Sequence, residues 1–82
     1  MRLDKYLKVS RIIKRRTVAN EACDAGRVVV NGKIARASYD VKVNDVIELT
    51  LGARTVKARV VSVNEYAKKG EAAMMYEIIE EK

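Results

Sequence analysis

Apolar residues near the start of the chain recur at the spacing of a helix. Leu3, Tyr6 and Leu7 stand at positions i, i+3 and i+4, which places their side chains on one helical face. Asp4 falls in the first turn of this helix, predicted over residues 3–9, where a carboxylate interacts favourably with the positive end of the helix dipole. We therefore expect a short helix with a buried apolar face, in which Asp4 stabilises the helix start or orients a neighbouring arginine.

A second helix is predicted from about residue 15 to residue 25, after a connection over residues 10–14. Small apolar residues lie along one side of it, which favours close packing against the first helix or a sheet. Gly26 then stands where a glycine in the left-handed conformation commonly ends a helix. We expect Ile12 and Ile13 of the connection to be core anchors, and Val18, Ala19 and Ala22 to lie on one side of the second helix with Cys23 beside them.

A hairpin pattern follows the second helix. Val28-Val29-Val30 precedes Asn31-Gly32, and another short apolar stretch comes after the turn. Asn-Gly is a strong hairpin signal, because both residues readily adopt the positive φ angles that a two-residue turn requires. We therefore expect two paired strands here.

Alternating apolar and polar positions predict further strands in the second half of the chain. Ile47, Leu49 and Leu51 share one face of the first of these strands. The expected segments are a loop at 36–45 with a turn at Asn44-Asp45, strands at 46–51 and 55–63, a polar loop at 64–73 and a last strand at 74–79. The order predicts an α+β fold, with two N-terminal helices packed on a small antiparallel sheet of four to five strands.

Charge is distributed unevenly along the chain. The 82 residues carry a net charge of +6; residues 1–36 contain ten Lys and Arg against three Asp and Glu, and residues 37–82 contain seven against eight. A merely solubilising surface would spread its charge along the whole chain. A localised positive excess is typical of a protein that binds a polyanion, with nucleic acid favoured over an acidic membrane surface.

Residue types that serve catalysis or metal binding are scarce. The chain has no His and a single Cys, Cys23, so it lacks an imidazole base, a Cys–His pair and a plausible set of metal ligands. No phosphate-binding glycine loop occurs either. We expect a protein that is not an enzyme, that uses no cofactor or metal, and in which Cys23 is a small core residue.

Features of targeting and redox chemistry predict the compartment. No apolar run approaches the roughly 18 residues of a membrane span, and the N-terminal residues are charged where a signal peptide would be apolar. A lone Cys excludes an internal disulfide, which fits a reducing environment. We expect a cytoplasmic protein with no membrane association.

Four short motifs follow one another through the first half of the chain. They are Arg2-Leu3-Asp4-Lys5-Tyr6-Leu7, Ser10-Arg11, Arg15-Arg16-Thr17-Val18-Ala19 and Gly26-Arg27-Val28-Val29-Val30-Asn31-Gly32. At this spacing they resemble the S-four RNA-binding domain, whose pattern opens with Arg-Leu-Asp and runs through Arg-x-x-Ala to Gly-x-Val-x-Val-Asn-Gly. The resemblance covers residues 1–51 well and 52–63 loosely. Asn44 departs from the glycine of the family pattern, which we expect to affect only a turn.

The resemblance implies a binding surface. In that family two helices present a basic face to structured RNA, and the hairpin beside them completes the surface. It implies an RNA-binding domain over residues 1–63, with residues 64–82 as a loop and final strand completing the same domain. The RNA-binding residues that we expect are Arg2, Lys5, Lys8, Arg11, Lys14, Arg15, Arg16, Lys33 and Arg36.

The resemblance also implies partners. The domain stands almost alone in this chain, which is therefore most similar to the stand-alone members of the family. These are a heat-shock protein that binds free large subunits carrying stalled peptidyl-tRNA and, more similar still, the shorter ribosome quality-control factors of Gram-positive bacteria, the RqcP type. The implied protein is a monomer that contacts 23S rRNA of the large ribosomal subunit and peptidyl-tRNA, and supports C-terminal tailing by a separate nascent-chain tailing factor.

Other functions stay open at this point. A basic two-helix unit can act as a general structured-RNA or DNA-binding module, although the hairpin directly after the second helix argues against DNA. A ribosome-assembly factor would carry the same basic surface. A protein–protein adaptor would use the acidic second half of the chain. Additional RNA contacts at Tyr39 or at Lys68-Lys69 also remain open.

Overall fold

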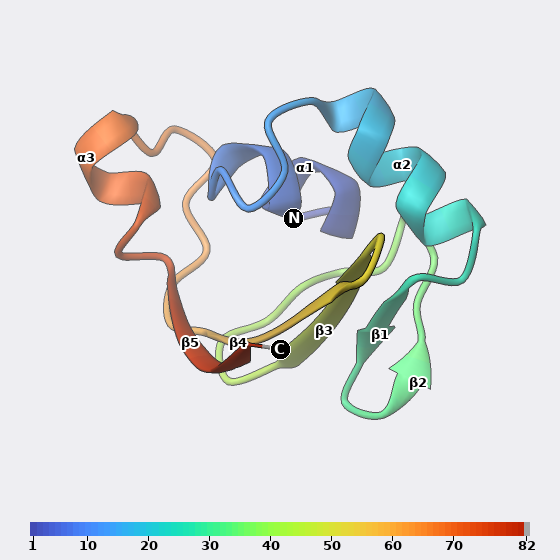
Figure 1. Ribbon diagram of the computed structural model, residues 1–82. Coiled ribbons are helices and arrows are strands. Elements are labelled where there is room, and N and C mark those ends of the chain that lie inside the picture. The colour runs from blue at the N-terminus through green and yellow to red at the C-terminus, as the bar shows by residue number, and fades with distance from the viewer. Residues whose placement is uncertain (82) are drawn as a thin grey trace.

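Helices cover one face of an antiparallel sheet (Figure 1). The computed structural model describes residues 1–81, and within them five strands pair in the order β2-β1-β3-β4-β5. The α+β fold expected from the sequence is confirmed. The elements are α1 (Leu3–Val9), α2 (Arg16–Asp24), β1 (Val28–Val30), β2 (Lys33–Ile34), β3 (Val46–Leu51), β4 (Arg54–Val60), α3 (Lys69–Ala72) and β5 (Tyr76–Glu81).

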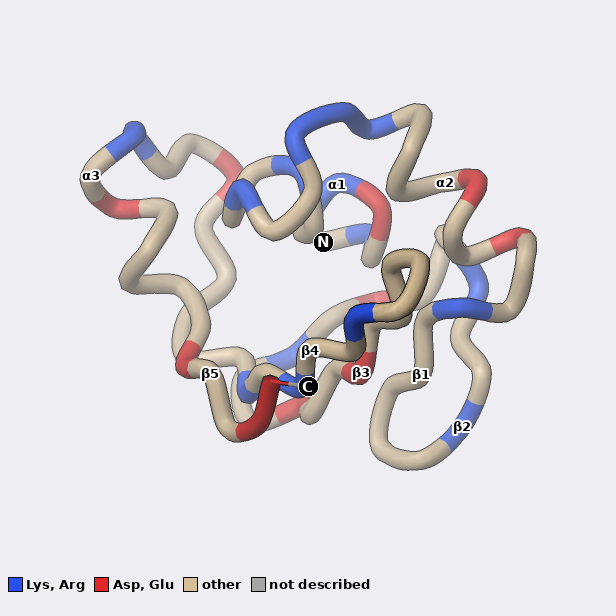
Figure 2. The backbone as a smooth tube through the Cα atoms, viewed as in Figure 1, with Lys and Arg blue, Asp and Glu red and all other residues tan. Residues whose placement is uncertain are grey.

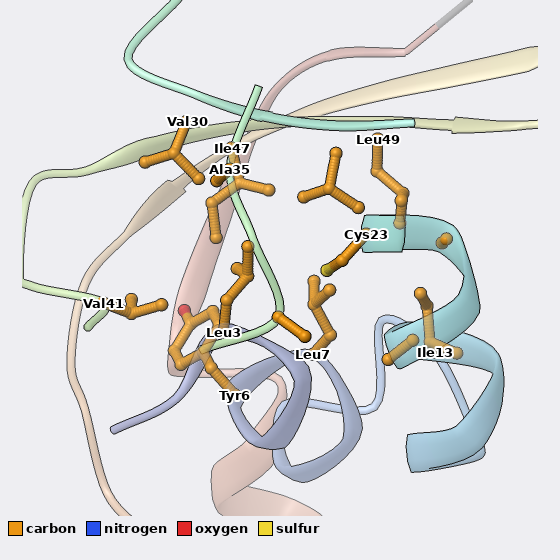
Figure 3. Close-up of a cluster of buried hydrophobic side chains, with 14 of the residues drawn as sticks. Leu3, Tyr6, Leu7, Ile13, Cys23, Val30, Ala35, Val41, Ile47 and Leu49 are labelled. Carbon is orange, nitrogen blue, oxygen red and sulfur yellow. The ribbon is translucent and has the colours of Figure 1, made fainter. Parts of the chain in front are cut away.

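The hydrophobic core lies between the helices and the inner face of the sheet (Figure 3). Leu3, Tyr6 and Leu7 are fully buried, as their spacing on α1 predicts. They share one cluster with Ile47 and Leu49 of β3. Burial of these side chains on both layers holds α1 against the sheet and so fixes the position of the basic residues that flank its apolar face.

Helix α2 buries a narrower face than the sequence predicts. Ala19, Ala22 and Cys23 are buried, but Val18, which was predicted to lie on the same side as Ala19 and Ala22, is 41% exposed. At about 100° per residue, Val18 lies about 140° around the helix from Cys23 and therefore outside the buried stripe. The small buried side chains allow α2 to approach its neighbours closely.

Positive φ angles occur at the turns where Gly and Asn were expected to supply them. Gly26 ends α2 with a φ of 73°, and Asn31 and Gly32 form the hairpin turn with φ angles of 52° and 83°. Asn44 adopts a φ of 76° before β3, so it takes the conformation that a glycine would. The predicted helix end, hairpin and tight turn are all confirmed.

Strands β3 and β4 pair in a continuous antiparallel register. Ile47 lies opposite Ala58, and both are buried, whereas Leu51 lies opposite Arg54 at the turn and is 36% exposed. Burial of the face predicted to hold Ile47, Leu49 and Leu51 therefore ends before Leu51. Strand β4 also ends at Val60, three residues before the predicted boundary.

The segment predicted as a polar loop at 64–73 contains the short helix α3, so that prediction is wrong over Lys69–Ala72. Ala72 and Met75 are each 1% exposed, and their burial gives the segment a reason to fold back onto the molecule. The Tyr6 hydroxyl donates a hydrogen bond to the Met75 carbonyl at 2.8 Å, which ties this segment to α1. Lys82, the last residue of the predicted segment 64–82, lies outside the described residues.

Candidate nucleic-acid interface

Asp4 lies at the centre of a polar cluster that joins α1 to α2. Its carboxylate accepts hydrogen bonds from Arg2, with Nε 3.1 Å from Oδ1 and Nη2 3.3 Å from Oδ2. Arg16 Nε and Asn20 Nδ2 each donate to Oδ2 at 3.4 Å, and the Lys5 backbone N–H donates to Oδ1 at 2.8 Å. The expectation that Asp4 orients a neighbouring arginine is confirmed, and it applies to two arginines.

The environment of Asp4 keeps its carboxylate ionised. Burial raises the pKa of this carboxyl, but hydrogen bonds from Arg2, Asn20 and the Lys5 amide, together with the charge of Arg16, lower it, and the pKa ends below its ordinary value. Hydrogen bonds to the charged form favour that form. Asp4 therefore remains an acceptor for both guanidinium groups at neutral pH.

Both arginines held by Asp4 also face solvent. The side chain of Asp4 is 3% exposed, whereas those of Arg2 and Arg16 are 51% and 49% exposed. Within residues 1–81, Arg16 forms its side-chain hydrogen bond through Nε alone, so its terminal nitrogens are left for a ligand. A positioned guanidinium fork matches the oxygen atoms of a phosphate group. The cluster thus presents two oriented guanidinium groups that can donate hydrogen bonds to phosphate.

A run of exposed cations connects the two helices. Lys14 and Arg15 lead directly into Arg16, the first residue of α2, and Figure 2 shows this run as a continuous basic stretch between α1 and α2. Arg15 is the N-cap in an extended conformation, and in the described chain no side chain caps the first turn of α2 and no acidic residue lies in it. The free backbone N–H groups of that turn can therefore also meet phosphate.

Arg11 adopts an unusual backbone conformation at the end of α1. Its φ of 64° lies in the left-handed region, which residues other than Gly, Asn and Asp rarely take. This conformation costs about 1 kcal/mol, and nothing in the burial of the exposed Arg11 side chain offsets it. A strained residue that presents a cation is consistent with a functional position.

Cations from α1 and from the connection to α2 line one open cavity. Lys8, Arg11 and Lys14 line a space of about 440 Å³, together with Glu65 and Ala67. The ammonium group of Lys5, by contrast, lies 3.5 Å from the Glu65 carboxylate and is partly neutralised there. Lys8, Arg11 and Lys14 therefore form the more strongly charged part of this surface.

The hairpin side of the predicted site borders the helices. Arg36 and Arg2 line a shared cavity of about 540 Å³ beside α2, and Lys33 and Arg36 line a second cavity of about 570 Å³ at the hairpin. Both Lys33 and Arg36 are exposed. The structure thus brings Arg2, Arg16 and Arg36 to one region and Lys8, Arg11 and Lys14 to another, with Arg15 between them in the chain.

The cations of β4 are engaged within the protein. Lys57 lies 3.5 Å from Glu48 and Arg59 lies 2.7 Å from Glu77. Arg54 forms an ion pair with Glu81. In Figure 2 basic and acidic segments alternate along β3, β4 and β5, whereas basic segments gather around α1 and the start of α2. Among the residues that the structure describes, the positive charge without a salt bridge therefore lies mainly on the helical layer and at the hairpin.

Two parts of the polar network were not predicted from the sequence. Asn20 bonds to Asp4, and its position four residues after Arg16 on α2 is a signal that could have placed both on one face. Asn31, expected chiefly to form a turn, also donates to Asp45 at 3.0 Å and accepts from the Val46 N–H at 2.9 Å. The Tyr39 hydroxyl donates to Asp45 at 2.9 Å, so Tyr39 has a structural anchor.

Cys23 has the features of a structural residue. It is 4% exposed, and burial raises the pKa of its thiol to about 11, which leaves the reactive thiolate scarce at neutral pH. Among residues 1–81, no three His, Cys, Asp or Glu side chains gather where they could hold a metal ion. In the same part of the chain, no helix has the length and apolarity to cross a membrane.

Comparison with known proteins finds relatives along nearly the whole chain. The S4 domain family matches residues 1–47. The RQC P-site tRNA stabilizing factor of Streptococcus pneumoniae is 57% identical, covering 99% of this chain and 92% of the relative, and that of Bacillus subtilis is 51% identical, covering 99% and 94%. The trimeric structure of Vibrio cholerae heat shock protein 15 superposes with a TM-score of 0.87 at 28% identity, covering 95% of this chain and 80% of that one.

Proposed function

The chain belongs to the S4 domain family, and from that premise we propose that it is an RNA-binding protein of the ribosome that acts beside tRNA in ribosome quality control. The relatives that match nearly its whole length are named RQC P-site tRNA stabilizing factors. Their names describe stabilising factors and not catalysts, which supports a function through binding.

One structural observation carries this proposal. The buried Asp4 carboxylate holds the exposed guanidinium groups of Arg2 and Arg16 side by side, next to the uncapped start of α2. Fixed guanidinium groups can bind the phosphates of a folded RNA in one orientation, and they do so at a lower entropic cost than freely moving side chains. An arrangement of this kind serves binding and positioning of RNA.

The finer parts of the proposal concern the partners. We propose that the bound RNAs are 23S rRNA of the large subunit and the stalled peptidyl-tRNA, contacted through the nine predicted cations. In this proposal the protein is a cytoplasmic monomer, it is not an enzyme, and the tailing of the nascent chain is carried out by a separate factor that it supports. The basic helical layer and the names of the relatives support this assignment.

Co-sedimentation with purified large ribosomal subunits tests the proposal. Arg16→Ala and Arg2→Ala should each weaken binding by roughly tenfold or more, since a hydrogen bond to a charged group contributes about 1.5–3 kcal/mol. Arg54→Ala removes the same charge from the sheet, where Arg54 is paired with Glu81, and should bind like the unaltered protein. Equal binding by all three variants would contradict the assigned surface.

Two competition experiments address the alternatives. Equal affinity for duplex DNA and structured RNA would favour a general nucleic-acid module over a ribosomal RNA-binding protein. Protein partners that persist in a pull-down after RNase treatment would favour an adaptor. We expect neither result, because Glu48 and Glu77 of the sheet are already paired with Lys57 and Arg59, and the cations predicted to bind RNA lie within residues 2–36.

A further inference from the structure

An aromatic side chain between β4 and β5 is left uncovered by the fold. Tyr66 is 85% exposed, whereas Tyr6 is fully buried and Tyr39 and Tyr76 are partly buried. An exposed aromatic ring leaves a large apolar surface in water and contributes little to folding. The Tyr66 ring is therefore accessible to a ligand.

The backbone that carries Tyr66 is anchored on both sides. Val63 and Ala67 pack against the core, so the residues flanking Tyr66 are fixed while its ring is not covered. The Tyr66 N–H donates to the Asn64 side-chain oxygen at 3.0 Å, and the neighbouring Glu65 lies 3.5 Å from Lys5 of α1. The ring is thus presented from a defined position next to α1.

This position adjoins the cationic cavity at the end of α1. Glu65 and Ala67, the residues on either side of Tyr66, line the cavity of about 440 Å³ together with Lys8, Arg11 and Lys14. Its volume lies in the range of small-ligand sites, about 300–1,000 Å³. Three cations outweigh one carboxylate that Lys5 already partly neutralises, so the cavity favours an anion.

More positive charge follows directly after Tyr66. Lys68 and Lys69 are both exposed, and neither forms a salt bridge within residues 1–81. In Figure 2 the basic segment at the start of α3 lies on the same side of the sheet as the basic segments of α1 and of the connection to α2. The segment that carries Tyr66 therefore lies between the cationic cavity, which Glu65 and Ala67 line, and Lys68-Lys69, which follow it in the chain.

From this juxtaposition we propose that Tyr66 and the cavity of Lys8, Arg11 and Lys14 together bind one unpaired nucleotide of the RNA. The three cations hold its phosphate, and its base stacks on the ring of Tyr66. An unpaired base offers a free face for stacking, whereas a paired base is already stacked within its helix. This site rests on the proposed RNA-binding function, and Tyr66 lies outside residues 1–47, which match the S4 domain.

Three matched RNAs test the proposal through dissociation constants measured with the full chain. One is a stem with a single bulged nucleotide, the second is the same stem fully paired, and the third carries an abasic residue at the bulge. The unaltered protein should bind the bulged stem roughly tenfold or more tightly than the other two, as expected for stacking of one base.

Variants of Tyr66 separate stacking from a general loss of apolar surface. Tyr66→Ala should abolish the preference for the bulged stem and leave affinity for the paired stem unchanged, whereas Tyr66→Phe keeps the ring and should keep the preference. Met74→Ala provides the matched control, because Met74 is 72% exposed in the same part of the chain and lacks an aromatic ring. The Met74→Ala variant should prefer the bulged stem as strongly as the unaltered protein does.

The outcomes distinguish this site from the proposed function. If the protein binds all three RNAs equally, or if Tyr66→Ala keeps the preference, the nucleotide site is overturned while RNA binding stands. Arg16→Ala should weaken binding to all three RNAs alike, because it acts at the separate Asp4 cluster. If the unaltered protein binds none of the RNAs, the proposed function fails and the nucleotide site fails with it.

Discussion

The side chain of Arg16 bonds to Asp4 across twelve residues of chain, with Nε 3.4 Å from Oδ2. Arg2 bonds to the same carboxylate, so a single buried acid sets the positions of two exposed cations. An acid within a phosphate-binding surface would weaken binding by charge alone. Its presence is explained by the orientation that it imposes on the two guanidinium groups.

Replacing Asp4 tests orientation against charge. Asp4→Asn makes the protein more positive, yet we expect its affinity for structured RNA of the large subunit to fall by roughly tenfold. The reason is that an amide offers one acceptor oxygen where the carboxylate offers two, and charged hydrogen bonds contribute about 1.5–3 kcal/mol. Dissociation constants at fixed salt, with thermal unfolding to confirm the fold, provide the measurement.

Asp24→Asn is the matched control for this experiment. Asp24 is an exposed acid at the end of α2, and it lines the cavity that Arg2 and Arg36 share. Its removal should leave the RNA affinity unchanged or increase it, because only a repulsive charge is lost. Stronger binding by Asp4→Asn as well would show that Asp4 contributes no orientation.

A second prediction concerns the left-handed conformation of Arg11. Arg11→Gly should raise the free energy of unfolding by about 0.5–1 kcal/mol, because glycine adopts a φ of 64° without strain. The same change should weaken RNA binding, since it removes a cation from the cavity. In the Arg11→Gly variant, urea denaturation should therefore show higher stability, and RNA titration should show lower affinity.

Arg11→Ala separates the two contributions of Arg11. Alanine lacks the charge but keeps the strain, so this variant should bind RNA as weakly as Arg11→Gly without gaining stability. A gain of stability in both variants would mean that charge repulsion from Lys8 and Lys14, and not backbone strain, destabilises the unaltered protein.

Local sequence signals predicted most of the first half of the fold. The spacing of Leu3, Tyr6 and Leu7 and the Asn31-Gly32 turn determine structure over a few residues, and the backbone follows them. The errors occur where tertiary contacts determine the secondary structure. Residues 69–72 look polar except for one alanine, and their helix is recognised only once Ala72 is seen to be buried.

The candidate site was predictable in its residue types but not in its geometry. Clustering of Lys and Arg in residues 1–36 indicated a binding surface, because charge can be counted from the sequence. The bond from Asn20 to Asp4 and the position of Glu65 beside Lys5 depend on how separate segments pack. Tyr66 was missed for the same reason, since its exposure follows from burial of its neighbours.

A third prediction concerns acid and the Asp45 network. Burial raises the pKa of the Asp45 carboxyl, but hydrogen bonds from the Lys42 N–H, Asn31 and Tyr39 lower it below its ordinary value of 3.8. Asp45 therefore stabilises the fold fully above that ordinary value, and the contribution is lost as the pH falls through the lowered value of the folded state. The free energy of unfolding should therefore fall as the pH is lowered from about one unit above 3.8 to below the lowered pKa of the folded state.

Asp45→Asn should reduce the dependence of stability on pH in that range and lower stability at pH 7. Asp24→Asn is the control, because Asp24 has no side-chain hydrogen bond within residues 1–81 and should not change the profile. If the Asp45 variant showed the full acid dependence, the stabilising role of its ionised carboxyl would be refuted. Asp4 and Asp40, whose carboxyl pKa values are also lowered, contribute to the dependence that remains.

The last prediction compares two lysines of α1 that differ in their ion pairing. Lys8 is exposed at the cationic cavity, whereas Lys5 lies 3.5 Å from Glu65. Each released counterion steepens the fall of RNA affinity with salt, so Lys8→Ala should reduce the slope of log affinity against log salt concentration by about 0.7–0.9. Lys5→Ala should reduce it by less, because Glu65 already takes the place of a counterion.

A titration between low and moderate salt measures both slopes. In a Glu65→Gln background, Lys5→Ala should reduce the slope as much as Lys8→Ala does. Equal slopes for the two lysine variants would mean that the Lys5–Glu65 pair opens when RNA binds.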